Sequence, residues 1–178
     1  MSLSHALLTS LIEKPSSGYD LARRFDKSIG FFWQATHQQI YRELSRMEGA
    51  GWIASEAAPD GGKTRKKLYT VLPEGRSELA RWAREPSPPA PMRDDFMVRM
   101  RADAAIGPLG LEEELKARQA AHASQLEAYR AIEARDFPPG RPLTREGRIQ
   151  RLILQTGIHF EEAWVNWTKE ALQVLAER

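Results

Sequence analysis

Prolines divide this sequence into two halves before any helix or strand is considered. The stretch Glu85–Pro91 contains Pro86, Pro88, Pro89 and Pro91. Proline has a fixed φ and no backbone N–H, so this stretch can form neither a helix interior nor a central strand. We interpret residues 86–92 as a semi-rigid linker between a domain of residues 1–85 and a domain of residues 93–178. The alternative is a proline-rich ligand for a partner protein.

Charge follows the same division. The 178 residues hold 26 Lys and Arg against 24 Asp and Glu, a net charge of +2 that excludes a polybasic coat. Residues 1–91 carry 13 basic and 10 acidic residues (+3), and residues 92–178 carry 13 and 14 (−1). Cysteine is absent, which excludes disulfides and thiolate metal sites. No apolar run reaches the ~18–20 residues of a membrane span and no signal peptide is evident, so we expect a cytoplasmic protein that does not enter a membrane.

The first half predicts three helices, a two-stranded wing and a fourth helix. Apolar periodicity, helix caps and turn residues set the boundaries. The predicted elements are helices at Ser4–Glu13, Gly18 to about Ser28 and Thr36–Glu48, strands at Trp52–Ala57 and Lys66–Leu72, and a helix that begins at Pro73. Two consecutive helices of this kind are typical of a helix-turn-helix, whose second helix enters the major groove of DNA.

The second half is almost wholly helical, so the fold class is mainly α (α+β). The predicted helices are Arg93–Asp103, Glu112–Ala134 and Thr144–Glu177. Apolar residues form a stripe along the last of these, namely Ile149, Ile153, Phe160, Trp164, Trp167, Ala171 and Leu175. Such a stripe is too wide to leave in water, so it packs on another helix of this chain or of a second copy.

The helix at Thr36–Glu48 carries side chains suited to reading DNA. If its apolar residues face inward, Gln38, Arg42 and Ser45 point outward. Their neighbours on the flanks are Gln39, Tyr41 and Arg46. Gln and Arg form bidentate hydrogen bonds with adenine and guanine edges. An ordinary solvated helix face is the alternative interpretation of this pattern.

The predicted wing strengthens the DNA interpretation. Four cations lie within Lys63–Lys67, just after the glycine pair Gly61-Gly62. Cations on a protruding hairpin can neutralise phosphates and release counterions. Protection of an exposed sheet edge by lysine is the alternative. The helix face and the wing together favour DNA.

A series of short motifs runs from Ala6 to Trp82. They are Leu7-Leu8, Ser17-Gly18-Tyr19-Asp20-Leu21, Gly30-Phe31-Phe32-Trp33, Gln39-Ile40-Tyr41-Arg42-Glu43-Leu44, Gly51-Trp52-Ile53, Lys67-Leu68-Tyr69 and Pro73-Glu74-Gly75-Arg76. In order and spacing these motifs closely resemble the PadR family of bacterial transcriptional regulators. Arg42 stands where the family usually has proline, which adds a cation to the predicted DNA face. Pro73 stands where threonine is usual, and proline is compatible with a helix start.

The resemblance implies a winged helix-turn-helix domain joined to helices that hold a homodimer. It further implies a repressor that binds a pseudo-palindromic operator in double-stranded DNA and is released by a small molecule. By the same resemblance, Tyr19 and Tyr41 lie near the DNA backbone. Together with the residue pattern, this predicts DNA contacts from Tyr19, Thr36, Gln38, Gln39, Tyr41, Arg42, Ser45, Arg46, Lys63, Arg65 and Lys66.

Aromatic residues in the last helix form a second candidate site. Phe160, Trp164 and Trp167 lie one turn apart and could stack on a small aromatic effector. Their other interpretation is the apolar core of a dimer interface. The sequence leaves both open.

Two rival functions remain at this stage. The chain could be a protein- or small-molecule-binding helical module with only weak DNA contact, or a metal enzyme using His159 and Glu162. The second lacks a third ligand, and Gly62-Lys63-Thr64 lacks the first glycine of a phosphate-binding loop. We expect no enzyme activity, no cofactor and no metal.

Overall fold

The computed structural model describes residues 3–26, 33, 35–57, 67–89, 91 and 93–177. The chain divides into two compact units, Met1–Pro89 and Ala90–Arg178. Each unit has its own cluster of buried apolar side chains.

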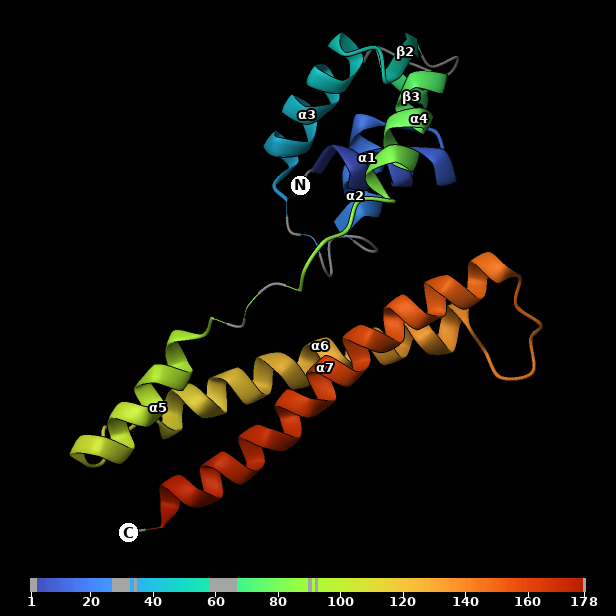
Figure 1. Cartoon of the computed structure of the whole chain (residues 1–178). Helices are drawn as coiled ribbons and strands as arrows, with labels where there is room; N and C mark the ends of the chain where they lie inside the picture. The colour runs from blue at the N-terminus through green and yellow to red at the C-terminus, as the bar shows by residue number, and fades with distance from the viewer. Residues whose placement is uncertain are drawn as a thin grey trace. The chain divides into compact units, whose positions relative to one another are not determined.

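The N-terminal unit has the predicted elements in the predicted order, with one additional strand, β1. They are α1 (Leu3–Glu13), β1 (Ser16–Ser17), α2 (Gly18–Asp26), α3 (His37–Gly49), β2 (Ile53–Ala57), β3 (Lys67–Val71) and α4 (Pro73–Trp82). Figure 1 labels the four helices and strands β2 and β3. The apolar faces of the helices meet in one core, which contains Leu7, Leu8, Leu11, Leu21, Phe25, Ile40, Leu44 and Met47. The fold class, a winged helix with a helical C-terminal region, is confirmed.

The sheet contains three strands, whereas the sequence predicted two. The strand order is β1-β3-β2, and both neighbours of β3 are antiparallel to it. Ser16 and Ser17 form the additional strand by pairing with Tyr69 and Leu68. A two-residue strand between two helices is too short to show an alternating pattern. This is why the sequence did not reveal it.

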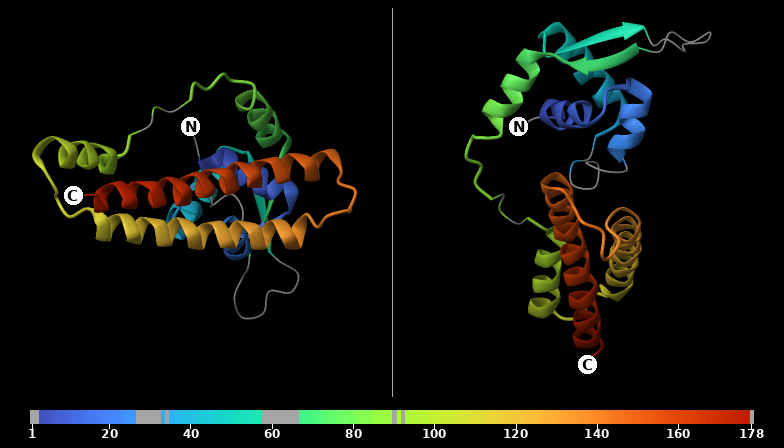
Figure 2. Two further views of the ribbon diagram at one scale, coloured as in Figure 1. Left: turned by 90° about the horizontal axis from the view of Figure 1, so that it is seen from below. Right: turned by 90° about the vertical axis from the view of Figure 1, so that its right-hand side faces the viewer.

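The C-terminal unit consists of α5 (Asp95–Ile106), α6 (Glu112–Asp136) and α7 (Arg145–Ala176). The last two form a long antiparallel hairpin, and they lie side by side in all views of Figures 1 and 2. Near the start of α6, Phe96 of α5 is buried with Leu115 and Ala171. Among the described helices, none is long and apolar enough to cross a membrane.

Only part of the apolar stripe on α7 packs within the chain. Ala171 is buried, and Trp167 and Leu175 pack against the cluster around Phe96. Ile149, Ile153 and Phe160 are instead exposed, together with Leu152. The face of α7 that meets α6 carries Gly157, whose missing Cβ would lie 2.8 Å from Cε2 of Tyr129. Glycine therefore allows close approach of the two helices at this point.

Candidate nucleic-acid interface

A capping box begins α3 at the predicted residue. The Thr36 hydroxyl oxygen accepts a hydrogen bond from the Gln39 amide at 3.2 Å, and Gln39 Oε1 accepts one from the Thr36 amide at 2.8 Å. Ile40, Leu44 and Met47 are buried, which fixes the rotation of the helix. Two of the predicted DNA contacts, Thr36 and Gln39, thus also hold the first turn of α3.

The opposite face of α3 is exposed as the sequence predicted. Gln38, Arg42 and Ser45 all lie on it. Within the described residues, Arg42 and Gln38 make no hydrogen bond or ion pair, so their donors are free for another molecule. The Ser45 hydroxyl donates to the backbone carbonyl of Tyr41 at 3.2 Å. This arrangement leaves a guanidinium and an amide projecting from one helix surface.

The two tyrosines that the family resemblance singled out flank this surface. Tyr41 is 44% exposed, and its ring lies against Gly18, where a Cβ would be 2.6 Å from Cε1. Tyr19 is 54% exposed, and the Arg23 guanidinium lies 5.6 Å from the centre of its ring. Glycine at position 18 therefore lets the Tyr41 ring of α3 pack closely on the start of α2.

Arg23 is a candidate DNA contact that the sequence reasoning missed. It is one turn after Tyr19 on α2, and its guanidinium lies over the tyrosine ring. The i, i+4 spacing of Tyr19 and Arg23 was the available signal. A cation beside an exposed phenol suits a phosphate group.

The end of α3 is joined to the wing strands by Glu48. The Ser55 hydroxyl of β2 donates to Oε1 of this carboxylate, and Lys67 Nζ of β3 lies 3.8 Å from Oε2. Burial, with a contribution from the charge of Glu48, raises the pKa of Tyr69 on β3. Glu48 therefore fixes strands β2 and β3 against the end of α3. The predicted wing contacts Lys63, Arg65 and Lys66 lie outside the described residues.

Arg46 lies on the flank of α3 and already has partners within the chain. Its Nε lies 3.1 Å from both carboxylate oxygens of Glu43, and its Nη2 lies 2.6 Å from Oε1. Its guanidinium also lies 5.3 Å from the ring centre of Trp52. The hydrogen bond from Arg46 lowers the pKa of Glu43, and Glu43 in turn raises the pKa of Arg46.

The predicted effector residues form a real aromatic cluster on α7. Trp164 stacks on His122 of α6, with ring centres 4.8 Å apart and planes 10° apart. Trp167 meets Trp164 edge to face at 5.2 Å, and Phe160 meets His122 in the same manner at 6.1 Å. His122 Nδ1 lies 2.5 Å from the buried carboxylate of Glu161. Phe160 is 56% exposed, so one side of the cluster faces outward.

The residues of the rival metal site have other surroundings. Glu162 accepts a hydrogen bond from Arg130 of α6 at 2.8 Å, and His159 is exposed. Within the described residues, no three His, Asp or Glu side chains gather in a way that could hold a metal ion.

Comparison with known proteins agrees with this geometry. Residues 7–81 match the model of the transcriptional regulator PadR-like family, and residues 92–176 match that of the virulence activator alpha C-terminal region. A probable transcriptional regulator from Mycobacterium tuberculosis is 41% identical over 188 residues, which cover the whole of both chains. This chain belongs to the PadR-like family. It is a DNA-binding transcriptional regulator with a winged helix.

Two further similar proteins have solved structures. The Vibrio cholerae virulence activator AphA is 30% identical, with 98% of each chain covered and a TM-score of 0.81. Bacillus subtilis PadR, a negative transcriptional regulator, has been solved with operator DNA; that structure is 25% identical, with 97% of each chain covered and a TM-score of 0.84. The same protein has been solved with p-coumaric acid, at 24% identity and a TM-score of 0.78 over 98% of this chain and 99% of that one.

Proposed function

We propose that this PadR-like protein is a homodimeric repressor that acts in the cytoplasm. Helix α3 of each copy reads one half of a two-fold symmetric operator. The observation that carries the proposal is the exposed face of α3, where Arg42 and Gln38 have no partner within the described residues. An Arg fork fits O6 and N7 of guanine, and a Gln amide fits adenine. Tyr19, Tyr41 and Arg23 then contact the phosphates on either side.

Operator binding by a relative supports the same role for α3. Bacillus subtilis PadR binds operator DNA through a chain of this fold and is named as a negative regulator. By analogy, the basic segment Lys63–Lys67 would add phosphate contacts, as its charge predicts. AphA is named as an activator, so the direction of regulation needs its own experiment.

The apolar surface on the first half of α7 supports self-association. Ile149, Leu152 and Ile153 are exposed, and their spacing places them on one side of the first half of α7. An exposed stripe of this size on a small helical unit marks an interaction surface. A two-fold axis through α7 would bury the same stripe of both copies. The two α3 helices of such a dimer would bind successive half-sites of the operator, one helical turn of DNA (~34–36 Å) or a multiple of it apart.

The aromatic cluster supports a small aromatic effector. Phe160 offers an exposed ring edge beside Trp164, and a planar ligand could stack there. A relative binds p-coumaric acid, which makes this phenolic acid a suitable first probe. Titration of the DNA complex with p-coumaric acid should release DNA from the wild-type protein and not from Phe160→Ala. Release that is equal in both proteins would place the effector elsewhere.

Selection of bound fragments from the host genome tests the regulatory proposal. The expected result is a two-fold symmetric sequence that overlaps a promoter, and a rise in transcription from that promoter when the gene is deleted. A fall in transcription would show an activator instead. Failure of the folded protein to select any sequence at near-physiological salt would favour the rival helical binding module.

A further inference from the structure

A connected group of side chains joins α3 to α1 and α4. We call it the His5 network, and it contains His5, Glu43, Arg46, Trp52, Glu78, Arg81 and Trp82. His5 is buried at its centre, between the rings of Trp52 and Trp82. The ring centres of His5 and Trp82 are 4.4 Å apart with planes 7° apart, and those of His5 and Trp52 are 6.2 Å apart.

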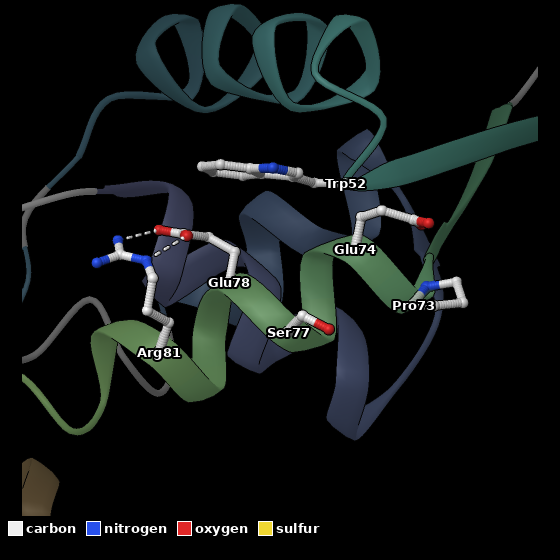
Figure 3. Close-up of a pocket in the computed structure, with 6 residues that line it drawn as sticks. All are labelled: Trp52, Pro73, Glu74, Ser77, Glu78 and Arg81. Carbon is white, nitrogen blue, oxygen red and sulfur yellow. Dashed lines mark hydrogen bonds and ion pairs between the residues drawn. The ribbon is translucent and has the colours of Figure 1, made fainter.

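Charged groups complete the network on the α4 side. Nε2 of His5 lies 3.0 Å from Oε1 of Glu78. Arg81 donates two hydrogen bonds to the same carboxylate, at 2.7 and 2.8 Å, and also pairs with Glu85. Figure 3 shows the Trp52 ring between α3 and Glu78 of α4. Trp52, Glu78 and Arg81 are among the residues that line a pocket of about 390 Å³.

Arg46 is the member of the network that belongs to α3. Its guanidinium satisfies both oxygens of Glu43 and lies over Trp52, so it is turned toward the protein. It lies on the flank of α3, and Arg42 on the outer face has no such partner within the described residues. The two arginines of one helix therefore have different surroundings.

Building on the proposed DNA-reading role of α3, we propose that Arg46 and Trp52 are positioning residues for this helix. Arg46 clamps the helix to Trp52, and Trp52 is held in turn by His5 and α4. The Arg46 guanidinium is then held by Glu43 and Trp52 of the same chain, and DNA is contacted by Arg42 and its neighbours. This differs from the sequence-based prediction that Arg46 touches DNA.

Two variants of Arg46 are needed, because Arg46→Lys changes the shape of the side chain while keeping its charge and Arg46→Ala removes both. Full-length Arg46→Lys and Arg46→Ala are compared on the selected operator over a range of salt concentrations, with Arg84→Ala as an exposed control cation on the same unit. Lysine lacks the planar fork and the stacking surface of arginine. Both Arg46 variants should therefore bind the operator roughly five- to tenfold more weakly, given the usual strength of one cation–π contact and one exposed ion pair.

The salt dependence separates the two roles of Arg46. A phosphate contact contributes about 0.9 to the slope of log K against log salt, so its loss would lower the slope by that amount. We expect an unchanged slope in Arg46→Ala and no recovery in Arg46→Lys. A reduced salt slope in Arg46→Ala, or wild-type operator affinity in Arg46→Lys, would overturn the positioning role of Arg46. Either result would leave the proposed DNA-binding function of the protein intact.

Trp52→Leu provides a second readout. Its loss of affinity should match that of Arg46→Ala, and the double variant should be no weaker than either, because both remove the same contact. Losses that add in the double variant would contradict the shared role. Thermal melting of each variant checks that it is folded. If Trp52→Leu does not fold, the result for Arg46→Lys, whose position is exposed, decides whether Arg46 is a positioning residue. Wild-type protein that binds no operator would contradict the proposed function instead.

Discussion

At the scale of single residues, close contacts explain why Gly75 and Gly18 are glycines. A Cβ at Gly75 would lie 2.3 Å from the backbone oxygen of Trp52 and 3.1 Å from Cδ2 of Leu8. That oxygen accepts a hydrogen bond from the Leu72 amide at 2.9 Å and cannot move freely. Gly18 is similarly enclosed by Tyr41. Gly75 therefore lies where two backbones are in direct contact, and Gly18 lies where a backbone contacts a tyrosine ring.

Gly75→Ala should destabilise the N-terminal unit. The added methyl group forces the start of β2 away from α4, and overpacking of this kind costs about 1–3 kcal/mol. Gly49→Ala on α3 is the control, because nothing lies within 4 Å of its Cβ position. The control should be neutral or slightly stabilising. Urea denaturation of both variants measures the difference, and equal stabilities would refute the close contact at Gly75.

Glu78 makes the stability of the N-terminal unit sensitive to acid. Hydrogen bonds from Arg81 and His5 lower the pKa of Glu78 from 4.5 to about 2. Because the pKa is lower in the folded state, the ionised carboxylate stabilises the fold above about pH 4.5, and this contribution is lost as the pH falls toward 2. Denaturation of wild type and Glu78→Gln at pH 6 and pH 3 should show a smaller acid loss in the variant. Parallel losses would show that Glu78 does not titrate in this way.

At the scale of elements, α3 depends on its cap. Thr36→Ala removes the hydroxyl that accepts the Gln39 amide, which typically costs about 1 kcal/mol. The Gln39 amide should then exchange with solvent roughly fivefold faster. Thr36→Ser should exchange like the wild type. Thr144→Ala removes the equivalent hydroxyl from α7 and should leave exchange in α3 unchanged.

Most elements could be predicted from the sequence, because their signals are local. The capping box at Thr36 and the period of Ile40, Leu44 and Met47 gave the start and the buried face of α3 correctly. Strand β1 and the His5 network could not be predicted, since both depend on contacts between distant segments. Nothing local to His5 indicates that it packs against Trp52 and Trp82. The same limit applies to Arg46. Its position in the sequence predicts that it lies on the flank of α3, but not which side chains it contacts.

At the scale of the whole molecule, α7 has two apolar faces, and only one is covered by α6. Leu152 is 63% exposed. Leu152→Glu should convert the proposed homodimer into a folded monomer, because the substitution places a charge in each copy of the proposed interface. Sedimentation velocity measures this, with Ala128→Glu on the exposed face of α6 as the control. A Leu152→Glu protein that still sediments as a dimer would place the interface elsewhere.

We propose that the outer face of α3 reads base sequence, and Arg42→Ala removes the side chain best suited to do so. Equilibrium binding is measured for wild type and variant on the selected operator and on random DNA of the same length and salt concentration. Loss of a bidentate base contact costs about 1–3 kcal/mol, so operator affinity should fall roughly 5- to 150-fold while affinity for random DNA changes little. Equal weakening on both DNAs would show that Arg42 contacts only phosphate, and would contradict base reading by this residue.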